Sequence, residues 1–228
     1  MDLIREFSML PLVVTILAYQ FGLFLQKKWK SPVFNPLLIA IILIIGVLLL
    51  TGYPTADYQA GMKTISWLMT PATICLAVPL YQQLQILRKD WKAIMAGICA
   101  GTPASLFFIF VMCRAFGFDQ ILTTSLLPKS ITTAMGTALS AQTGGDEAIT
   151  TAAIVITGIL GNILGVPLCR LFKITDPVAQ GVAFGTSAHV IGTSKARELS
   201  DLSGAVSSLS LTVAGILTAI LFPLITML

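Results

Sequence analysis

The stretch GVAFGTSAHVIGTSKA, from Gly181 to Ala196, decides the fold. It has the length of a helix, yet it carries three glycines, four hydroxyl side chains, His189 and Lys195. Polar groups that face lipid without a partner cost several kcal/mol each, so this segment cannot lie against acyl chains. We therefore predict that the segment is interrupted and that it faces the protein interior or a hydrated cavity.

The rest of the chain has the composition of a membrane protein. Of its 228 residues, 56% are hydrophobic and 11% are charged, whereas soluble domains carry about 25% charged residues. A helix needs about 20 apolar residues to cross the hydrocarbon core. The sequence therefore predicts an all-α polytopic membrane protein with seven to eight transmembrane segments. The candidates are residues 7–26, 33–51, 64–83, 93–116, 121–143, 147–171, 178–197 and 204–227.

We expect one membrane domain, residues 1–228, in two parts. Residues 1–116 are expected to form a lipid-facing scaffold, and residues 121–228 a core that holds both interrupted segments, 121–143 and 178–197. Interrupted segments in two corresponding places are typical of the binding site of a transporter. The alternative is that their hydroxyl side chains only hold neighbouring helices together.

Charge predicts the topology. The loops KKWK (27–30) and RKDWK (88–92) are strongly basic, so both should be cytoplasmic, with the N-terminus outside. If segment 121–143 crossed fully, the acidic pair at 146–147 would lie inside and the basic residues of 170–173 outside, against the positive-inside rule. If it enters and returns, the basic residues become cytoplasmic. The two interrupted segments would then enter from opposite faces, an inverted relation.

The first candidate site is LLPKSITTAMG, residues 126–136. Pro128 removes a backbone donor and favours a helix start, whose free N–H groups and positive dipole end suit an anion. Lys129 adds a full charge, and an ionisable residue inside an apolar span indicates function. Alternatively, Lys129 extends to the interface and the hydroxyls bond their own helix. The expected substrate-binding residues here are Lys129, Ser130, Thr132 and Thr133, with Pro128 and Gly136 shaping the backbone.

The second candidate site surrounds His189, the only histidine of the chain. Gly185 and Gly192 bracket it, and glycine permits an unwound backbone that can offer amide or carbonyl groups. His189 could carry a proton near neutral pH, although a lone histidine is usually only hydrogen-bonded. The expected substrate-binding residues are His189, Thr193 and Lys195, with Ser187 and Asn162 in supporting positions.

Several other functions are excluded. The centres of the segments carry no carboxylates, which leaves no acid pair or Ser-His-Asp triad for an enzyme. The four cysteines and the histidine do not cluster as metal ligands, and no cofactor is expected. The net charge of +4 comes without a basic, aromatic stripe, which argues against nucleic acid.

Together, the motifs LLPKSITTAMG, GILGNILG (158–165), AFGTSAHVIGTSKARELSDLSGAVSSLSL (183–211), PATICLAVPLYQQ (71–83) and NPLLIA (35–40) resemble the LrgB/CidB family over essentially the whole chain. The segment 128–172 also distantly resembles the broken-helix region of bile-acid/sodium symporter-like carriers, which implies an inverted repeat. One departure is TTAMGTALS at 132–140, where relatives commonly read TTPIAM. The missing proline puts a second break in segment 121–143 in doubt.

The resemblance implies two functions. One is a carrier of small monocarboxylates (pyruvate, glycolate or acetate) that works by alternating access. The other is an antiholin-like regulator that acts with a small LrgA/CidA-type membrane protein, without transport of its own, to control murein hydrolase activity and lysis. Both imply a bacterial cytoplasmic membrane protein. Coupling to H⁺ through His189 or to Na⁺ through backbone carbonyls is left open, and a homodimer is the base-rate expectation.

The re-entrant topology predicts opposite accessibility for two loops. Single cysteines placed at residues 144–147 should react with a membrane-impermeant thiol reagent from outside the cell, and those at 173–176 only from the cytoplasm. Labelling of intact and permeabilised cells measures this difference. Reaction of 144–147 from the cytoplasm alone would contradict the re-entrant topology.

Overall fold

The computed structural model describes residues 9–29, 34–75 and 77–226, and the described residues contain helices and no strands. The chain divides into two compact units, Met1–Cys75 and Leu76–Leu228. Four helices are long and apolar enough to cross a membrane, namely Leu10–Trp29, Trp91–Ala115, Glu147–Leu171 and Asp201–Thr226. The expectation of an all-α membrane protein is therefore confirmed. The count of seven to eight crossings stays a prediction, as does the division into scaffold and core.

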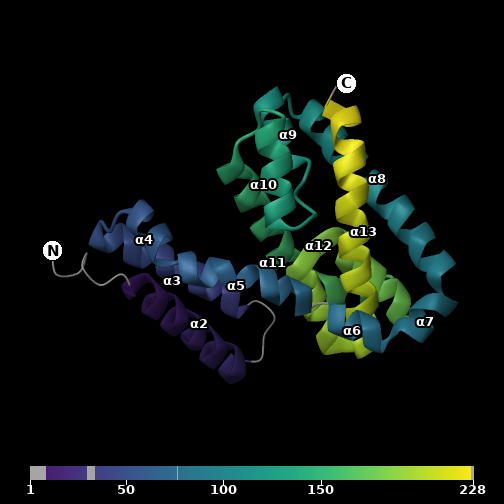
Figure 1. Cartoon of the computed structure of the whole chain (residues 1–228), viewed down its shortest axis with the longest axis horizontal. Coiled ribbons are helices and arrows are strands. Elements are labelled where there is room, and N and C mark those ends of the chain that lie inside the picture. The colour runs from purple at the N-terminus through teal and green to yellow at the C-terminus, as the bar shows by residue number, and fades with distance from the viewer. Residues whose placement is uncertain (1–8, 30–33, 76, 227–228) are drawn as a thin grey trace. The chain divides into compact units, whose positions relative to one another are not determined.

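The first unit is an apolar helical hairpin followed by two further helices (Figure 1). Helix α2 (Leu10–Trp29) packs on α3 (Pro36–Thr51), and Gly22 permits the contact because a Cβ there would lie 2.7 Å from the Pro36 carbonyl oxygen. Asn35 caps α3, since its Oδ1 accepts from the amide of Leu37 at 2.9 Å. Helices α4 (Thr55–Gly61) and α5 (Lys63–Cys75) complete the unit.

The second unit contains the remaining helices, shown in teal to yellow in Figure 1. Two short helices, α6 (Ala77–Gln82) and α7 (Leu84–Lys89), lead into α8 (Trp91–Ala115). Within the expected segment 64–83, the described residues lie in helices α5 and α6. Helices α8, α11 (Glu147–Leu171) and α13 (Asp201–Thr226) are long and continuous. Helix α8 packs against α13 through a buried apolar cluster that includes Ile94, Ile98, Val206 and Ala214.

The expected segment 121–143 is a hairpin of two short helices, α9 (Gln120–Leu126) and α10 (Thr133–Gln142) (Figure 1). The chain returns to the side of α9, because the amide of Asp146, which follows α10, donates to Ser125 Oγ at 2.7 Å. The connecting residues 127–132 form the tip, and a Cβ on Gly136 would lie 3.3 Å from the carbonyl oxygen of Pro128. We call this element, residues 120–142, the first hairpin.

Helix α12 (Pro177–Leu199) also reverses direction, whereas the sequence predicted only an interruption. The interruption lies at Ala188 (φ −125°, ψ 16°) and His189 (φ 42°, ψ −138°). After it, Gly192 packs against Phe184, and an added Cβ would lie 2.8 Å from the Phe184 carbonyl oxygen. Residues eight positions apart in a straight helix would be about 12 Å apart. The element is therefore a second hairpin, with its tip at Ala188–His189.

Both ends of the second hairpin lie beside the start of α13. At the first end, Ser203 Oγ donates to the carbonyl oxygen of Pro177 at 2.9 Å. At the other end, Gly204 packs against Arg197, and a Cβ there would overlap the arginine side chain. The predicted interruption of segment 178–197 is therefore a complete reversal of the chain.

The close packing around glycine in the second hairpin predicts how one substitution changes the stability of the protein. A Cβ at Gly185 would overlap the Ser207 carbonyl oxygen and lie 2.7 Å from Ser210 Cβ, so Gly185→Ala should destabilise the protein by about 1–3 kcal/mol through overpacking. The matched variant Gly46→Ala has nothing within 4 Å of its new methyl group. Thermal unfolding in detergent should show a lower melting temperature for Gly185→Ala alone. Equal melting temperatures for the two variants would contradict the packing described here.

Candidate functional site

Both hairpins contact one residue in the middle part of α11, the first through Gly136 of α10 and the second through its tip. The Ile154 side chain is fully buried, and its Cδ1 atom faces Gly136 of the first hairpin, where a Cβ would come within 2.6 Å. The carbonyl oxygen of Ile154 accepts a hydrogen bond from His189 Nε2 at 2.8 Å. The structure thus brings the two sequence-predicted sites together around α11.

The hairpins approach this point from opposite ends of α11. Ser125 of α9 and Ser140, near the end of α10, lie beside Thr150, whose Oγ1 is 3.0 Å from the Ser125 carbonyl and 2.8 Å from Ser140 Oγ. In the second hairpin, Ala188 faces Gly161 and Phe184 faces Gly165. The first tip therefore points along α11 toward its C-terminus, and the second tip points toward its N-terminus.

The first tip carries the positive charge of the site. Lys129 is half-buried, its Nζ donates to Ser130 Oγ at 3.1 Å, and it lies within electrostatic range of the His189 ring. Thr132 caps α10 through a 3.4 Å hydrogen bond from the Met135 amide, while the Thr133 carbonyl accepts from a hydroxyl in its own helix. Of the four expected binding residues, Lys129 and Ser130 therefore have the placement that suits a ligand.

Hydrogen bonds to its own backbone and to α13 fix the position of the second tip. Thr193 Oγ1 donates to the carbonyl oxygen of His189 at 2.9 Å and lies 2.9 Å from Ser207 Oγ. Asn162 Nδ2 of α11 donates to the Ile191 carbonyl at 3.3 Å. Ser187 is exposed and donates to Ala183 in the same arm.

Lys195 lies away from both tips. It forms an ion pair with Glu198 at 2.5 Å, near the open end of the second hairpin. Gly185 and Gly192 are not themselves at the reversal, which lies between them at Ala188–His189. Their role in the structure is close packing, against Ser207 and Phe184 respectively.

A small hollow, with several hydroxyl side chains in a largely apolar lining, lies between the first tip and α8. It has a volume of about 10 Å³, the size of one oxygen atom or water molecule, and it touches α8, the first tip, the second hairpin and α13. Thr102 of α8 is 4% exposed, and its hydroxyl has no hydrogen-bond partner among the described residues. The sequence did not indicate Thr102, because it lies within an otherwise apolar segment. The lining side chains are Thr102, Ser105, Leu106, Leu127, Ser130, Ile131, Thr186, Ala214 and Thr218.

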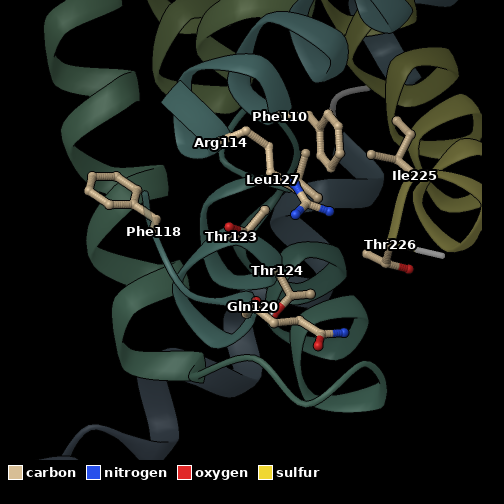
Figure 2. Close-up of a pocket in the computed structure, with 9 residues that line it drawn as sticks. All are labelled: Phe110, Arg114, Phe118, Gln120, Thr123, Thr124, Leu127, Ile225 and Thr226. Carbon is tan, nitrogen blue, oxygen red and sulfur yellow. Dashed lines mark hydrogen bonds between the residues drawn. The ribbon is translucent and has the colours of Figure 1, made fainter. Parts of the chain in front are cut away.

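A larger cavity of about 290 Å³ opens beside the first hairpin and contains the guanidinium group of Arg114 (Figure 2). Arg114 and Phe110 come from the last part of α8, Gln120, Thr123 and Thr124 from α9, and Thr226 from the end of α13. The first unit has an apolar cavity of about 480 Å³, lined by α2, α3 and the segment that follows α3. Neither cavity was anticipated from the sequence, because helix periodicity does not show where helix ends converge.

These features define an integral membrane protein whose polar residues are concentrated on two interrupted helices inside one bundle. The chain belongs to the LrgB-like family, whose model matches residues 15–228. It is 33% identical to the holin-like protein CidB of Staphylococcus aureus over 221 residues, which are 97% of this chain and 96% of that protein. It is 34% identical to the antiholin-like protein LrgB of Bacillus cereus over 214 residues, 93% of each chain. No solved structure matches the chain.

The family resemblance seen in the sequence motifs is thus confirmed. The relatives are named as a holin-like and an antiholin-like protein, and membership of the LrgB-like family is what the comparisons establish for this chain.

The contact between the first hairpin and α11 yields a prediction about one buried hydroxyl. Thr150→Val removes the group that bonds Ser125 and Ser140 while keeping the side-chain shape, so it should cost about 1–3 kcal/mol of stability. Thr151→Val is the matched control, since Thr151 bonds only to the Glu147 carbonyl of its own helix and should stay within about 0.5 kcal/mol. Thermal unfolding in detergent measures both. A larger loss of stability for Thr151→Val would show that the buried network is not what holds this hairpin.

Proposed function

We propose that this protein carries small monocarboxylates, of the pyruvate, glycolate or acetate type, across the bacterial cytoplasmic membrane by alternating access. The observation that supports the proposal most is that two hairpins, one with Lys129 at its tip and the other with His189 at its tip, both contact Ile154 of α11, with Lys129 in electrostatic range of His189. Ionisable groups at membrane depth are costly and therefore indicate a functional site.

The polarity of the meeting point suits an anion. The returning arms of both hairpins, α10 and residues 190–199, begin at the tips, so their N-terminal ends are directed toward the middle of the bundle. Helix N-termini carry partial positive charge and free N–H groups. Lys129 adds a full positive charge. Three aspartate carboxylates of this unit accept hydrogen bonds at helix starts instead. Asp119, Asp146 and Asp176 cap the starts of α9, α11 and α12.

The opposed hairpins support an inverted repeat, in which the two interrupted helices enter from opposite faces of the membrane. Transporters with this arrangement hold the substrate near the bilayer midplane and expose it to each side in turn. In this proposal Lys129 and Ser130 bind the carboxylate, and Thr132 and Thr133 position the start of α10. His189 and Thr193 form the opposite wall, and Lys195 acts near the open end of its hairpin. The coupling ion in this proposal is H⁺, carried by His189, with Na⁺ as the alternative.

A second candidate function has support in the names of the relatives. They are a holin-like and an antiholin-like protein. On this reading the chain is a regulatory partner of a small LrgA/CidA-type membrane protein, and the hairpins are helix-packing devices without transport. The two functions can coexist, because a flux of organic acid changes membrane energetics and thereby influences lysis.

The carrier proposal predicts saturable uptake. Purified protein in liposomes should take up radiolabelled pyruvate, glycolate or acetate, and Lys129→Ala should abolish uptake because the carboxylate loses its charged partner. Lys92→Ala is the control, since Lys92 is exposed at the start of α8. Proton coupling predicts that an imposed pH gradient drives uptake by the parent protein, and that His189→Asn removes this drive.

Uptake equal to that of empty liposomes across the whole panel of acids would refute the carrier. Dye leakage that requires the small partner protein and shows no solute specificity would favour the regulator instead.

A further inference from the structure

The buried face of α8 carries one hydroxyl group among apolar side chains. Ile98, Thr102 and Leu106 follow one another at intervals of one turn, and all three are buried. Ile98 packs in the apolar cluster that contains Val206, and Leu106 packs in the cluster that contains Leu127 of the first tip. Thr102 therefore lies between two apolar clusters, near the midpoint of a helix that is long enough to cross a membrane.

Thr102 does not make the hydrogen bond that satisfies most hydroxyl groups of this bundle. Thr186, which lines the same small hollow, donates to the carbonyl oxygen of Val182 one turn earlier at 2.8 Å. Thr102 and Ser210 are the two buried hydroxyls without a partner among the described residues, and Thr102 is the one that lines the hollow. A buried hydroxyl without a partner is unfavourable, so its presence at a cavity indicates a missing ligand.

The hollow offers hydrogen-bond donors to a single atom. Ser130 of the first tip lines it together with Thr102. Because Ser130 Oγ accepts from Lys129 Nζ at 3.1 Å, the hydrogen of Ser130 is left for another acceptor. The hydrogen of Thr102 is likewise unused within the described part of the chain. The hollow has a volume of about 10 Å³, which holds one oxygen atom.

The charge beside the hollow favours an anion over a cation. Lys129 is bonded to Ser130, and the described side chains that line the hollow include no carboxylate. A sodium ion in the hollow would be repelled by the ammonium group, with no negative group to offset the repulsion. An oxygen of a carboxylate would instead be attracted to Lys129 and would accept hydrogen bonds from the two hydroxyls.

We propose that Thr102 is a substrate-binding residue, and that one oxygen of the substrate carboxylate enters the hollow and accepts hydrogen bonds from Thr102 and Ser130. The inference rests on the proposed carrier function and extends its binding site from the two hairpins to α8. Because the hollow holds only one oxygen atom, the rest of the acid needs room that the first tip provides by moving away from α8. Substrate binding is thereby coupled to a movement of the first hairpin.

Binding can be measured without transport. Purified protein in detergent is titrated with potassium pyruvate in sodium-free buffer, and the rise in melting temperature gives a dissociation constant. Thr102→Val keeps the side-chain shape and should raise this constant about tenfold or more, because a hydrogen bond to a charged group is lost. Thr102→Ser keeps the hydroxyl and should restore most of the affinity. Thr212→Val is the matched control, since Thr212 is exposed and bonds the Ser208 carbonyl of its own helix.

The melting temperature without pyruvate separates a binding hydroxyl from a structural one. Thr102 has no partner to lose among the described residues, so Thr102→Val should unfold at the parent temperature or above it. A lower melting temperature with an unchanged dissociation constant would assign the hydroxyl to a fixed water molecule and overturn the proposal. A loss of affinity that occurs only in buffer containing sodium would assign the hollow to a cation and overturn it as well.

These results are separable from the fate of the carrier. If the parent protein takes up pyruvate and Thr102→Val binds it with normal affinity, the role of Thr102 is refuted and the carrier stands. If the parent protein binds pyruvate but takes up no acid, weaker binding by Thr102→Val upholds the binding site and refutes the carrier. A parent protein that neither binds nor takes up any acid of the panel would refute both.

Discussion

The arrangement of the core depends on the close approach of the second hairpin to α11. Three glycines of α11 provide the surface, with Gly158 facing His189, Gly161 facing Ala188 and Gly165 facing Phe184. A Cβ at Gly158 would lie 2.7 Å from the histidine ring, and at the other two it would overlap the facing side chain. Without this contact His189 could not reach the carbonyl of Ile154, and its polar ring would lie unsatisfied inside an apolar bundle.

The sequence left open whether the hydroxyl groups of the hairpins line a cavity or hold neighbouring helices together. In the structure they do both. Most of them bond a carbonyl one turn earlier, as Thr186 and Thr137 do, which satisfies them at little cost inside a membrane. Others join separate elements, such as Thr193 with Ser207 and Thr150 with Ser140. Thr102 has no partner in the described part of the chain, and it lies at the hollow between the first tip and α8. Hydroxyl groups therefore hold the hairpins together, and several of them also line the small hollow beside the first tip.

The sequence predicted the helical segments and the two interruptions well. The length of an apolar run, and the polar residues inside it, can both be read from neighbouring positions of the sequence. It did not predict that α12 folds back on itself, since the evidence for the reversal is contact between Gly192 and Phe184 and between Gly204 and Arg197. Glycine at 185 and 192 suggested unwound backbone, whereas the positive φ belongs to His189. Arg114 was overlooked because a basic residue in the last turn of an apolar helix is ordinary, and only the convergence of α8, α9 and α13 gives it a cavity.

The position of α13 after the second hairpin in the chain has a consequence for biogenesis. Both arms of the second hairpin pack against residues 203–210, through Gly181 and Gly185 on one arm and Thr193 on the other. During synthesis these residues leave the ribosome after the hairpin does, so the hairpin has no surface to pack on until α13 has been made. A product truncated before α13 would keep its polar reversal exposed in the bilayer, where membrane proteases and chaperones act. Packing of the second hairpin therefore depends on the synthesis of α13.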